Sequence, residues 1–277
     1  MPALPSAGMN SAISPRRHRT LWISDVHLGT PGCKAAALAD FLKQNECEQL
    51  YLVGDIIDGW ALRSEFYWPQ EHSNVVRRIL TKAKRGTRVT YVTGNHDEFL
   101  RKFVDTALAL GNIEVVNEAV HRTADGRRLL VTHGDAFDVI TRYHRWIAVA
   151  GDALYRATMR ANEMLNRGRR LAGLGYWSLS AYAKQRVKTA ASIISDFEQS
   201  VAHECRRRKF HGVVCGHIHH AEIRPIGTIT YHNCGDWVES CTALAEDHTG
   251  QIRVLRAPRA ERPALAAVAS LPLASNG

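Results

Sequence analysis

Short apolar runs that each end in a polar motif are the feature that most limits the fold of this 277-residue chain. The runs have four to six residues and are rich in Val, Ile, Leu and Tyr, as in LYLV before Gly54-Asp55 and VTYVT before Gly94-Asn95. Runs of this length bounded by turn residues are typical of buried strands. Helix-like segments at 34–44 and 74–85 lie between them. The pattern therefore predicts an α/β domain with polar side chains gathered where strands end.

The remaining parts of the chain differ in composition from this domain, which we expect to occupy residues 20–256. Residues 1–19 are rich in Pro, Ser, Ala and Arg without periodicity and predict a disordered arm, and residues 257–277 predict a flexible tail. Residues 138–209 are rich in Ala, Leu and Arg and contain few β-branched runs. They predict a helical insertion, or cap, made of two long helices at about 139–167 and 178–209. The pair Asp125-Gly126 predicts a hairpin.

Positive charge is concentrated in this insertion. The chain has a formal net charge of +9, and residues 138–209 hold fourteen Lys or Arg against six Asp or Glu, a balance of +8. Such a block suits an anionic partner, namely nucleic acid, an acidic membrane surface or a phosphorylated substrate. A solvated helix face without a partner is the alternative reading. The apolar residues among the arginines, such as Trp146 and Trp177, either line a groove for acyl chains or pack the helices together.

The sequence also bears on location. No run approaches the ~20 apolar residues that span a bilayer. The N-terminal residues before Arg16, Arg17 and Arg19 contain no apolar h-region, so a signal peptide is not expected. The six cysteines are scattered without a C-x-x-C, which argues against a cysteine-ligated zinc site and favours a reducing compartment. We therefore expect a cytoplasmic protein, and the basic block adds a peripheral position on the inner face of the membrane as an option.

Five motifs that follow strand-like runs carry the residues of a metal site. They are Asp25-Val26-His27, Gly54-Asp55, Gly94-Asn95-His96-Asp97, His133-Gly134-Asp135 and Gly216-His217-Ile218-His219. Side chains two apart on an extended segment point to the same side, so Asp25 and His27 are expected to reach one ion together, and His217 and His219 repeat that spacing. Carboxylate, amide and imidazole ligands without thiolate suit Mn²⁺, Fe or Zn²⁺. The two oxygens of Asp55 allow it to bridge two ions.

The order of these motifs resembles the pattern D-x-H, G-D, G-N-H-[DE], H, G-H-x-H of the calcineurin-like metallophosphoesterase superfamily. The resemblance runs from about Leu21 to Arg256, apart from the insertion. It implies a four-layer double β-sheet sandwich flanked by helices, with two divalent metal ions. One ion would be bound by Asp25, His27, Asp55 and His219, and the other by Asp55, Asn95, His133 and His217. His96 would contact the phosphoryl oxygens or protonate the leaving oxygen, and Asp97 would orient its ring.

Within that superfamily the chain is most similar to the UDP-2,3-diacylglucosamine diphosphatases of lipid A synthesis. The similarity rests on chain length, the stretch LVGDIIDGW at 52–60, the His-Gly-Asp motif, the position of the insertion and the late Gly235-Asp236-Trp237. Typical members of that group carry Arg where this chain has His96. The resemblance implies a substrate with a phosphate ester or a diphosphate, such as an acylated nucleotide sugar.

Two other functions stay open at this stage. The first is a phosphodiesterase or phosphomonoesterase that acts on soluble nucleotides or nucleic acid, which the positive charge also suits. The sequence contains no separate DNA-binding motif such as a zinc finger. The second is a non-catalytic binding module with a decayed metal site. Decay would remove ligands, whereas every residue of the motifs is present.

Overall fold

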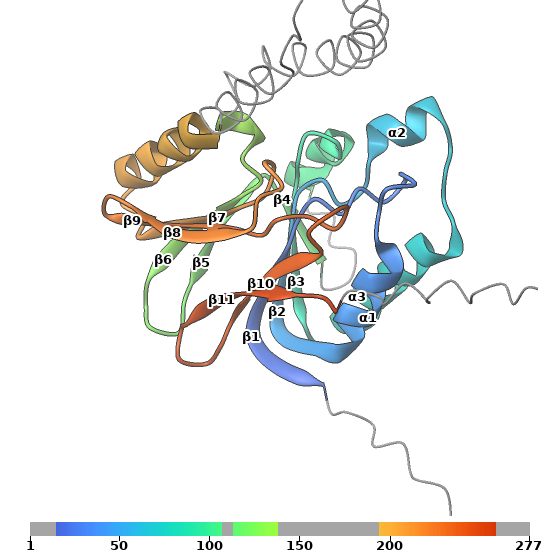
Figure 1. The fold of residues 1–277 in the computed structure, drawn as a ribbon, viewed down its shortest axis with the longest axis horizontal. Helices are drawn as coiled ribbons and strands as arrows, with labels where there is room; N and C mark the ends of the chain where they lie inside the picture. The colour runs from blue at the N-terminus through green and yellow to red at the C-terminus, as the bar shows by residue number, and fades with distance from the viewer. Residues whose placement is uncertain (1–14, 107–112, 138–193, 259–277) are drawn as a thin grey trace, which may run out of the picture.

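The computed structural model describes residues 15–106, 113–137 and 194–258, and Figure 1 shows their arrangement as two β-sheets packed face to face with helices outside them. The first sheet has the strand order β11–β10–β1–β2–β3–β4 and the second the order β5–β6–β7–β9–β8. The strands of the first sheet are β1 (Arg16–Ile23), β2 (Asn45–Val53), β3 (Arg88–Val92), β4 (Ile113–Val116), β10 (Thr242–Glu246) and β11 (Ile252–Arg256). Those of the second are β5 (Glu118–Arg122), β6 (Arg128–Thr132), β7 (Gly212–Cys215), β8 (Glu222–Ile226) and β9 (Ile229–Asn233).

Helices cover the outer face of each sheet. On the first sheet these are α1 (Ala35–Gln44) and α3 (Gln70–Lys84), whose buried side chains join one apolar cluster with the strands below them. On the second sheet residues 194–207 form a helix whose apolar face shares a cluster with β6, β7 and β9. A third cluster lies between the sheets. Successive side chains of β1 point to opposite faces of the sheet and so join two different clusters. Leu21 and Ile23 face the helices, and Trp22 faces the second sheet. The expected four-layer sandwich is confirmed.

Strand direction brings the polar motifs to one end of the molecule. β1, β2 and β3 are parallel neighbours in the first sheet, and β6, β7 and β9 are parallel neighbours in the second. Chain segments that leave parallel strands emerge at the same edge, where ligands of α/β proteins commonly bind. Short elements complete this edge, namely α2 (Gly59–Ser64) and the 3₁₀ segments η1 (Glu98–Thr106) and η2 (Asp135–Phe137).

Several boundaries differ from those expected. β1 begins at Arg16, so residues 16–19 are strand and do not belong to a disordered arm. The physical reason is pairing, because Arg16 to His18 align with Asn45 to Cys47 of β2, and Arg19 forms an ion pair with buried Glu246. The hairpin at Asp125-Gly126 is confirmed as the turn between β5 and β6. The short strands β4 and β8 were not anticipated.

The expected insertion is described only in part. Residues 194–207 are helical, and their buried side chains belong to the core of the domain. Residues 1–14, 138–193 and 259–277, which include most of the expected cap, the start of the arm and most of the tail, lie outside the described residues. Within the described ranges, no helix has the length and apolar character needed to cross a membrane.

Candidate metal centre

The predicted metal ligands lie in the loops that follow five strands. Asp25 and His27 follow β1, Asp55 follows β2, Asn95 follows β3, His133 follows β6, and His217 and His219 follow β7. Three groups of potential ligand atoms lie within 4.8 Å of one another. They are Asp25, His27 and His219; His27, Asp55 and His96; and Asp55, His133 and His217. The fold therefore brings together residues that are up to 194 positions apart in the printed sequence.

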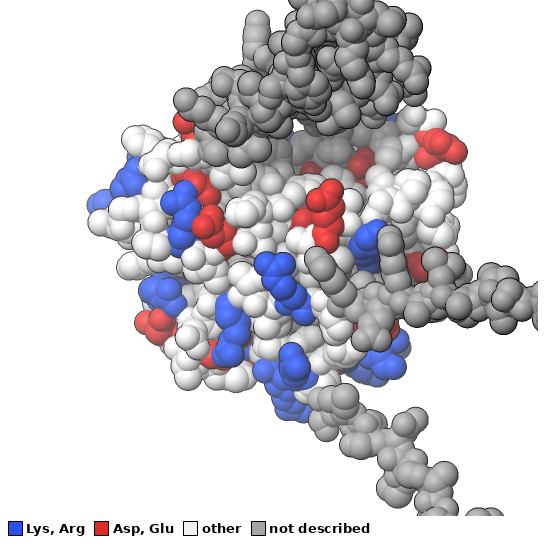
Figure 2. Space-filling model, viewed as in Figure 1, with Lys and Arg blue, Asp and Glu red and all other residues white. Residues whose placement is uncertain are grey.

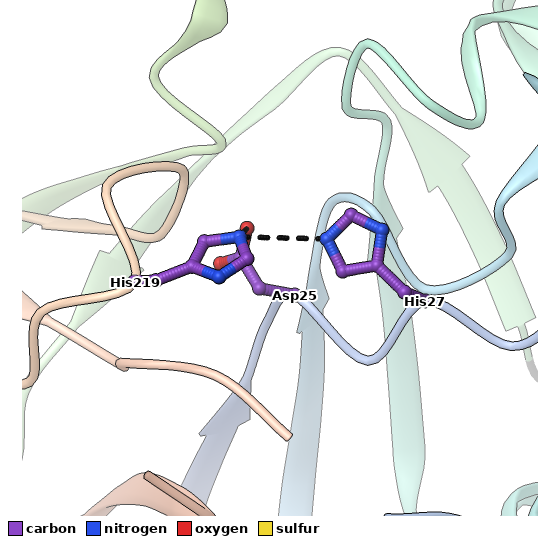
Figure 3. A group of neighbouring side chains, drawn as sticks. All are labelled: Asp25, His27 and His219. Atoms are coloured by element: carbon purple, nitrogen blue, oxygen red, sulfur yellow. Dashed lines mark hydrogen bonds and ion pairs between the residues drawn. The ribbon is translucent and has the colours of Figure 1, made fainter. Parts of the chain in front are cut away.

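The first group, Asp25, His27 and His219, joins the loop after β1 of the first sheet to the loop after β7 of the second sheet (Figure 3). The rings of His27 and His219 face each other across a 3.4 Å Nε2–Nε2 distance, and His219 Nε2 is 3.2 Å from Asp25 Oδ1. In the last group, His133 Nε2 is 3.3 Å from Asp55 Oδ2, and the rings of His133 and His217 meet edge to face at 5.1 Å. Asp55 belongs to the second and third groups, so its carboxylate lies in the middle of the cluster.

The backbone at this cluster is strained in a consistent way. Five of the predicted ligands have positive φ values, namely Asp25 at 52°, His27 at 54°, Asp55 at 53°, His217 at 71° and His219 at 55°. A residue with a side chain in this left-handed region costs on the order of 1–3 kcal/mol, and such residues gather at functional sites. The segments that carry D-x-H and H-x-H are therefore not extended, contrary to the expectation from their spacing. His217 and His219 join different groups, whereas Asp25 and His27 do meet.

Two buried ligand atoms fit a bound cation, because neither makes a hydrogen bond within the described residues and His133 Nε2 lies only 3.3 Å from the Asp55 carboxylate. Asn95 Oδ1 and His133 Nε2 are buried and make no hydrogen bond within the described residues. A buried polar atom without a partner is costly, so such atoms call for an explanation. The other ring nitrogen of His133, Nδ1, lies 3.0 Å from the carbonyl oxygen of Val53, which orients the ring with Nε2 toward Asp55. A metal ligand whose second nitrogen is held by an oxygen acceptor has this arrangement.

Glycine at position 94 allows the backbone of the loop after β3 to lie close to the Asp55 carboxylate. A Cβ atom there would clash with Asp55 Oδ1 and would lie 2.6 Å from the Asp55 amide nitrogen. Only glycine allows the loop after β3 to pass so close to the carboxylate. His96 N, two residues further on, donates a 2.8 Å hydrogen bond to Asp55 Oδ1. The close approach thus fixes both the Asp55 side chain and the loop that carries Asn95.

The electrostatics of the cluster favour positive charge. Burial raises the pKa of the Asp55 carboxyl, but the charges and hydrogen bonds of His133 and His96 outweigh burial and hold that pKa well below its ordinary value. Burial lowers the pKa of His133, yet the carboxylates of Asp55 and Asp25 raise it to about 10. The pKa of His219 is likewise raised, since Asp25 outweighs the effect of burial. Carboxylates that hold positive charge in a buried site can equally hold metal cations.

Asp58, and not Asp97, contacts the ring of His96. Asp58 Oδ2 lies 2.9 Å from His96 Nδ1 and 3.0 Å from His27 Nδ1, so one carboxylate orients both rings. Burial raises the pKa of Asp58, but its bonds to these two histidines hold the pKa far below its usual range. Sequence reasoning did not assign this role, although Asp58 lies only three residues after Asp55.

Asp97 lies on the other side of the loop. Its carboxylate accepts hydrogen bonds from the backbone nitrogens of Gly94 and Ile56 and from the hydroxyl of Tyr91. It is fully buried, and burial raises its pKa. The expected contact between Asp97 and the His96 ring is therefore replaced by a role in joining the loops that carry Asp55 and Asn95.

A loop without any predicted ligand holds two of the ligand loops together. Asn233, at the end of β9, donates a 2.7 Å hydrogen bond to the carbonyl oxygen of Gly216 and accepts one of 2.9 Å from Gly235 N. Trp237 N donates to the carbonyl oxygen of Asp25 at 3.0 Å. The late Gly235-Asp236-Trp237 stretch thus connects the loops after β1 and β7. Only the tertiary structure reveals this role for Asn233.

The rim of the cluster carries further groups. The ring of Trp60 packs at 4.3 Å from the ring of His96, and its Nε1 donates to Glu98 at 3.2 Å. Asp135, two residues after His133, forms a 2.6 Å ion pair with Arg101 of η1, so it ties the loop that carries His133 to η1.

Comparisons with known proteins agree with the motifs. The family model described as calcineurin-like phosphoesterase matches residues 18–221 of the chain. A search of curated proteins found no match to the chain.

Among solved structures, a single mutant of Vps29 from Entamoeba histolytica is 13% identical, with a TM-score of 0.40, over 85% of this chain and 96% of that one. A conserved predicted phosphoesterase from Streptococcus pneumoniae TIGR4 is 13% identical, with a TM-score of 0.34, over 86% of this chain and 97% of that one. An archaeal phosphodiesterase is 12% identical, with a TM-score of 0.38, over 85% of this chain and 98% of that one.

Proposed function

The chain belongs to the calcineurin-like phosphoesterase family, and from this premise we propose that it is a hydrolase of a phosphate ester or diphosphate bond that works with two divalent metal ions. The observation that carries the proposal is the position of Asp55, whose carboxylate lies within reach of ligand atoms from both halves of the cluster. A carboxylate with ligands on both sides can bridge two cations.

The assignment of ligands combines these groups of neighbouring atoms with the ligand sets that the family resemblance implies. We assign Asp25, His27, Asp55 and His219 to the first ion, and Asp55, Asn95, His133 and His217 to the second. The unsatisfied Asn95 Oδ1 and His133 Nε2 support the second set. Imidazole, amide and carboxylate donors without thiolate favour Mn²⁺, with Fe or Zn²⁺ as alternatives.

The chain's own groups would then handle the substrate. When bound, the two ions supply an activated water and neutralise charge on the phosphoryl oxygens. His96 Nε2 lies 3.9 Å from Asp55 Oδ2, whereas the other ring nitrogen, Nδ1, lies 2.9 Å from Asp58 Oδ2. Because Asp58 occupies Nδ1, Nε2 is the atom that can bond a phosphoryl oxygen or protonate the leaving oxygen. Burial of the Asp25, His27 and Asp55 side chains keeps bulk water from competing for these positions.

For the substrate we propose an acylated nucleotide diphosphate sugar, of the kind that UDP-2,3-diacylglucosamine diphosphatases cleave. The stretch LVGDIIDGW at 52–60 and the basic, apolar segment at 138–209 support this choice. The same segment supports a peripheral contact with an anionic membrane surface. His96, which stands where typical members have Arg, is the residue that argues for a different substrate.

A phosphodiesterase for soluble nucleotides or nucleic acid is the second candidate. On the face in Figure 2, Lys and Arg side chains of the described residues lie among Asp and Glu side chains and form no continuous basic surface. That face offers little to a long polyanion, which binds through many phosphate contacts. A non-catalytic module is disfavoured because the described structure brings the motif histidines and aspartates together.

A substrate panel with added Mn²⁺ tests the proposal. Purified protein is assayed on UDP-2,3-diacylglucosamine, bis-p-nitrophenyl phosphate, ADP-ribose and single-stranded DNA, each with Mn²⁺ and with EDTA. We expect hydrolysis that EDTA abolishes, fastest for the acylated diphosphate. A higher kcat/KM for bis-p-nitrophenyl phosphate or DNA would transfer the proposal to the second candidate. No hydrolysis of any substrate would leave the binding module as the better account.

A further inference from the structure

Phe197 lies where the described helix 194–207 meets the loops of two predicted ligands. Its ring is 5.9 Å from the ring of His217, with the planes tilted by 39°. On the other side its Cζ atom would be 2.7 Å from a Cβ atom on Gly134, the residue directly after His133. Phe197 therefore touches both the side chain of His217 and the backbone next to His133.

The two histidines and Phe197 form one packed unit. The His133 ring is oriented at Nδ1 by the Val53 carbonyl, and it meets the His217 ring edge to face at 77°. The His217 ring thus packs against both the ring of His133 and the ring of Phe197. Aromatic rings at such distances contribute specific geometry as well as buried area. Removal of the Phe197 ring would take away one packing contact of the His217 ring.

The position of Phe197 itself is well fixed. The side chain is only 3% exposed and packs with Val201, Leu130 and Val213. The next residue, Glu198, is 1% exposed and forms an ion pair with Arg224 of β8, which fixes the rotation of the helix over the sheet. Phe137, at the end of η2, packs against the same cluster. The helix therefore presents the Phe197 ring to the histidines from a rigid support.

We infer that Phe197 is a positioning residue for the second metal ion, because it holds the His217 ring and the loop after His133 in the geometry that binds the ion. This inference rests on the proposed two-ion site. The first ion, assigned to Asp25, His27, Asp55 and His219, shares Asp55 with the second. His217 also reaches Asp25, but through its backbone nitrogen, which lies 3.0 Å from Asp25 Oδ2, and not through the ring that Phe197 contacts. Phe197 should therefore control the affinity of one ion and leave the other unchanged. Groups that support metal ligands in this way typically account for 10–100-fold in affinity.

Calorimetric titration of the metal-free full chain with Mn²⁺ tests the inference. The variants are Phe197→Leu, which keeps an apolar side chain in the cluster, and Val201→Ala as the matched control. Val201 is fully buried in the same helix and cluster, one turn further along. We expect Phe197→Leu to lower the affinity for the second ion by ~10–100-fold and to leave the affinity for the first ion unchanged. Val201→Ala should bind both ions with wild-type affinity.

Other results would overturn the inference in distinguishable ways. Wild-type affinity for both ions in Phe197→Leu would show that the ring does not position His217. An equal loss of affinity for both ions in Phe197→Leu would show general damage to the fold. Selective loss of affinity for the second ion in Val201→Ala would show the same. A wild-type protein that binds a single ion would refute the two-ion site of the proposed function, and the role of Phe197 with it.

Discussion

A buried histidine outside the groups of predicted metal ligands makes the stability of the fold depend on pH. His232 of β9 is 1% exposed, and its Nδ1 lies 2.8 Å from the carbonyl oxygen of Val213. Burial, assisted by the charge of Arg127, lowers its pKa to about 4. The unfolded chain binds a proton at this residue near the ordinary pKa of about 6.5. Acid therefore stabilises the unfolded state first, and stability falls as the pH drops from about 7 toward 4.

The size of the effect follows from the two pKa values. A difference of about 2.5 pKa units corresponds to about 3 kcal/mol, of which about 2 kcal/mol is lost by pH 5. Below pH 4 both states carry the proton and His232 contributes no further loss. Urea denaturation at pH 7.5 and pH 5.0, with EDTA present, measures the change in the free energy of unfolding. The pH dependence of the whole protein contains contributions from other groups, so the informative quantity is a difference between variants.

His232→Asn isolates the contribution of this residue. Its amide can donate to the Val213 carbonyl in place of Nδ1, while it cannot take up a proton. We expect the loss of stability between pH 7.5 and 5.0 to be about 2 kcal/mol smaller in this variant than in the wild type. His248→Asn is the control, because the side chain of His248 is 61% exposed. The same pH dependence in His232→Asn and wild type would refute the reasoning.

The remaining predictions concern the cluster. His96→Ala should lower kcat by ~10²–10⁴-fold, the range of a general acid–base group, with Mn²⁺ content unchanged; loss of both ions would mean that His96 is a metal ligand. Asp58→Asn should lower kcat by ~10–100-fold and alter the pH–rate profile, because the Asp58 carboxylate orients the rings of His27 and His96. An unaltered profile would contradict this role. Tyr91→Phe removes one hydrogen bond of Asp97 and should cost about 1 kcal/mol in urea denaturation with kcat retained, whereas a large loss of kcat would assign Asp97 to catalysis.

The strands and their polar ends could be predicted because both depend on local sequence. A run such as LYLV must be buried on both faces, and a Gly-Asp pair after it can only lie at the strand's end. The parallel order of β1, β2 and β3 then brings Asp25, Asp55 and Asn95 to one edge. The shared position of the motifs, read from spacing alone, is therefore borne out by the fold.

The contacts between loops could not be predicted in this way. Asp58 and Asp97 are both carboxylates close to a ligand motif, and the sequence does not tell which of them faces His96. That choice depends on how the loops after β2 and β3 pack, since Asp97 is held by Gly94, Ile56 and Tyr91. The left-handed backbone at the ligands is equally a product of tertiary packing, because local preference disfavours it.

Loss of the negative charge on Asp55 tests the central claim, a two-ion site bridged by this carboxylate, most directly. Asp55→Asn keeps the size of the side chain, and Asp40→Asn, at an exposed position on α1, is the matched control. Metal analysis after equilibration with Mn²⁺ and gel filtration gives the number of ions per chain, and the rate on the best substrate of the panel is measured alongside. We predict two ions in the wild type and in Asp40→Asn, at most one in Asp55→Asn, and a rate lowered by at least ~10²-fold. Two ions and an unchanged rate in Asp55→Asn would contradict the bridging role.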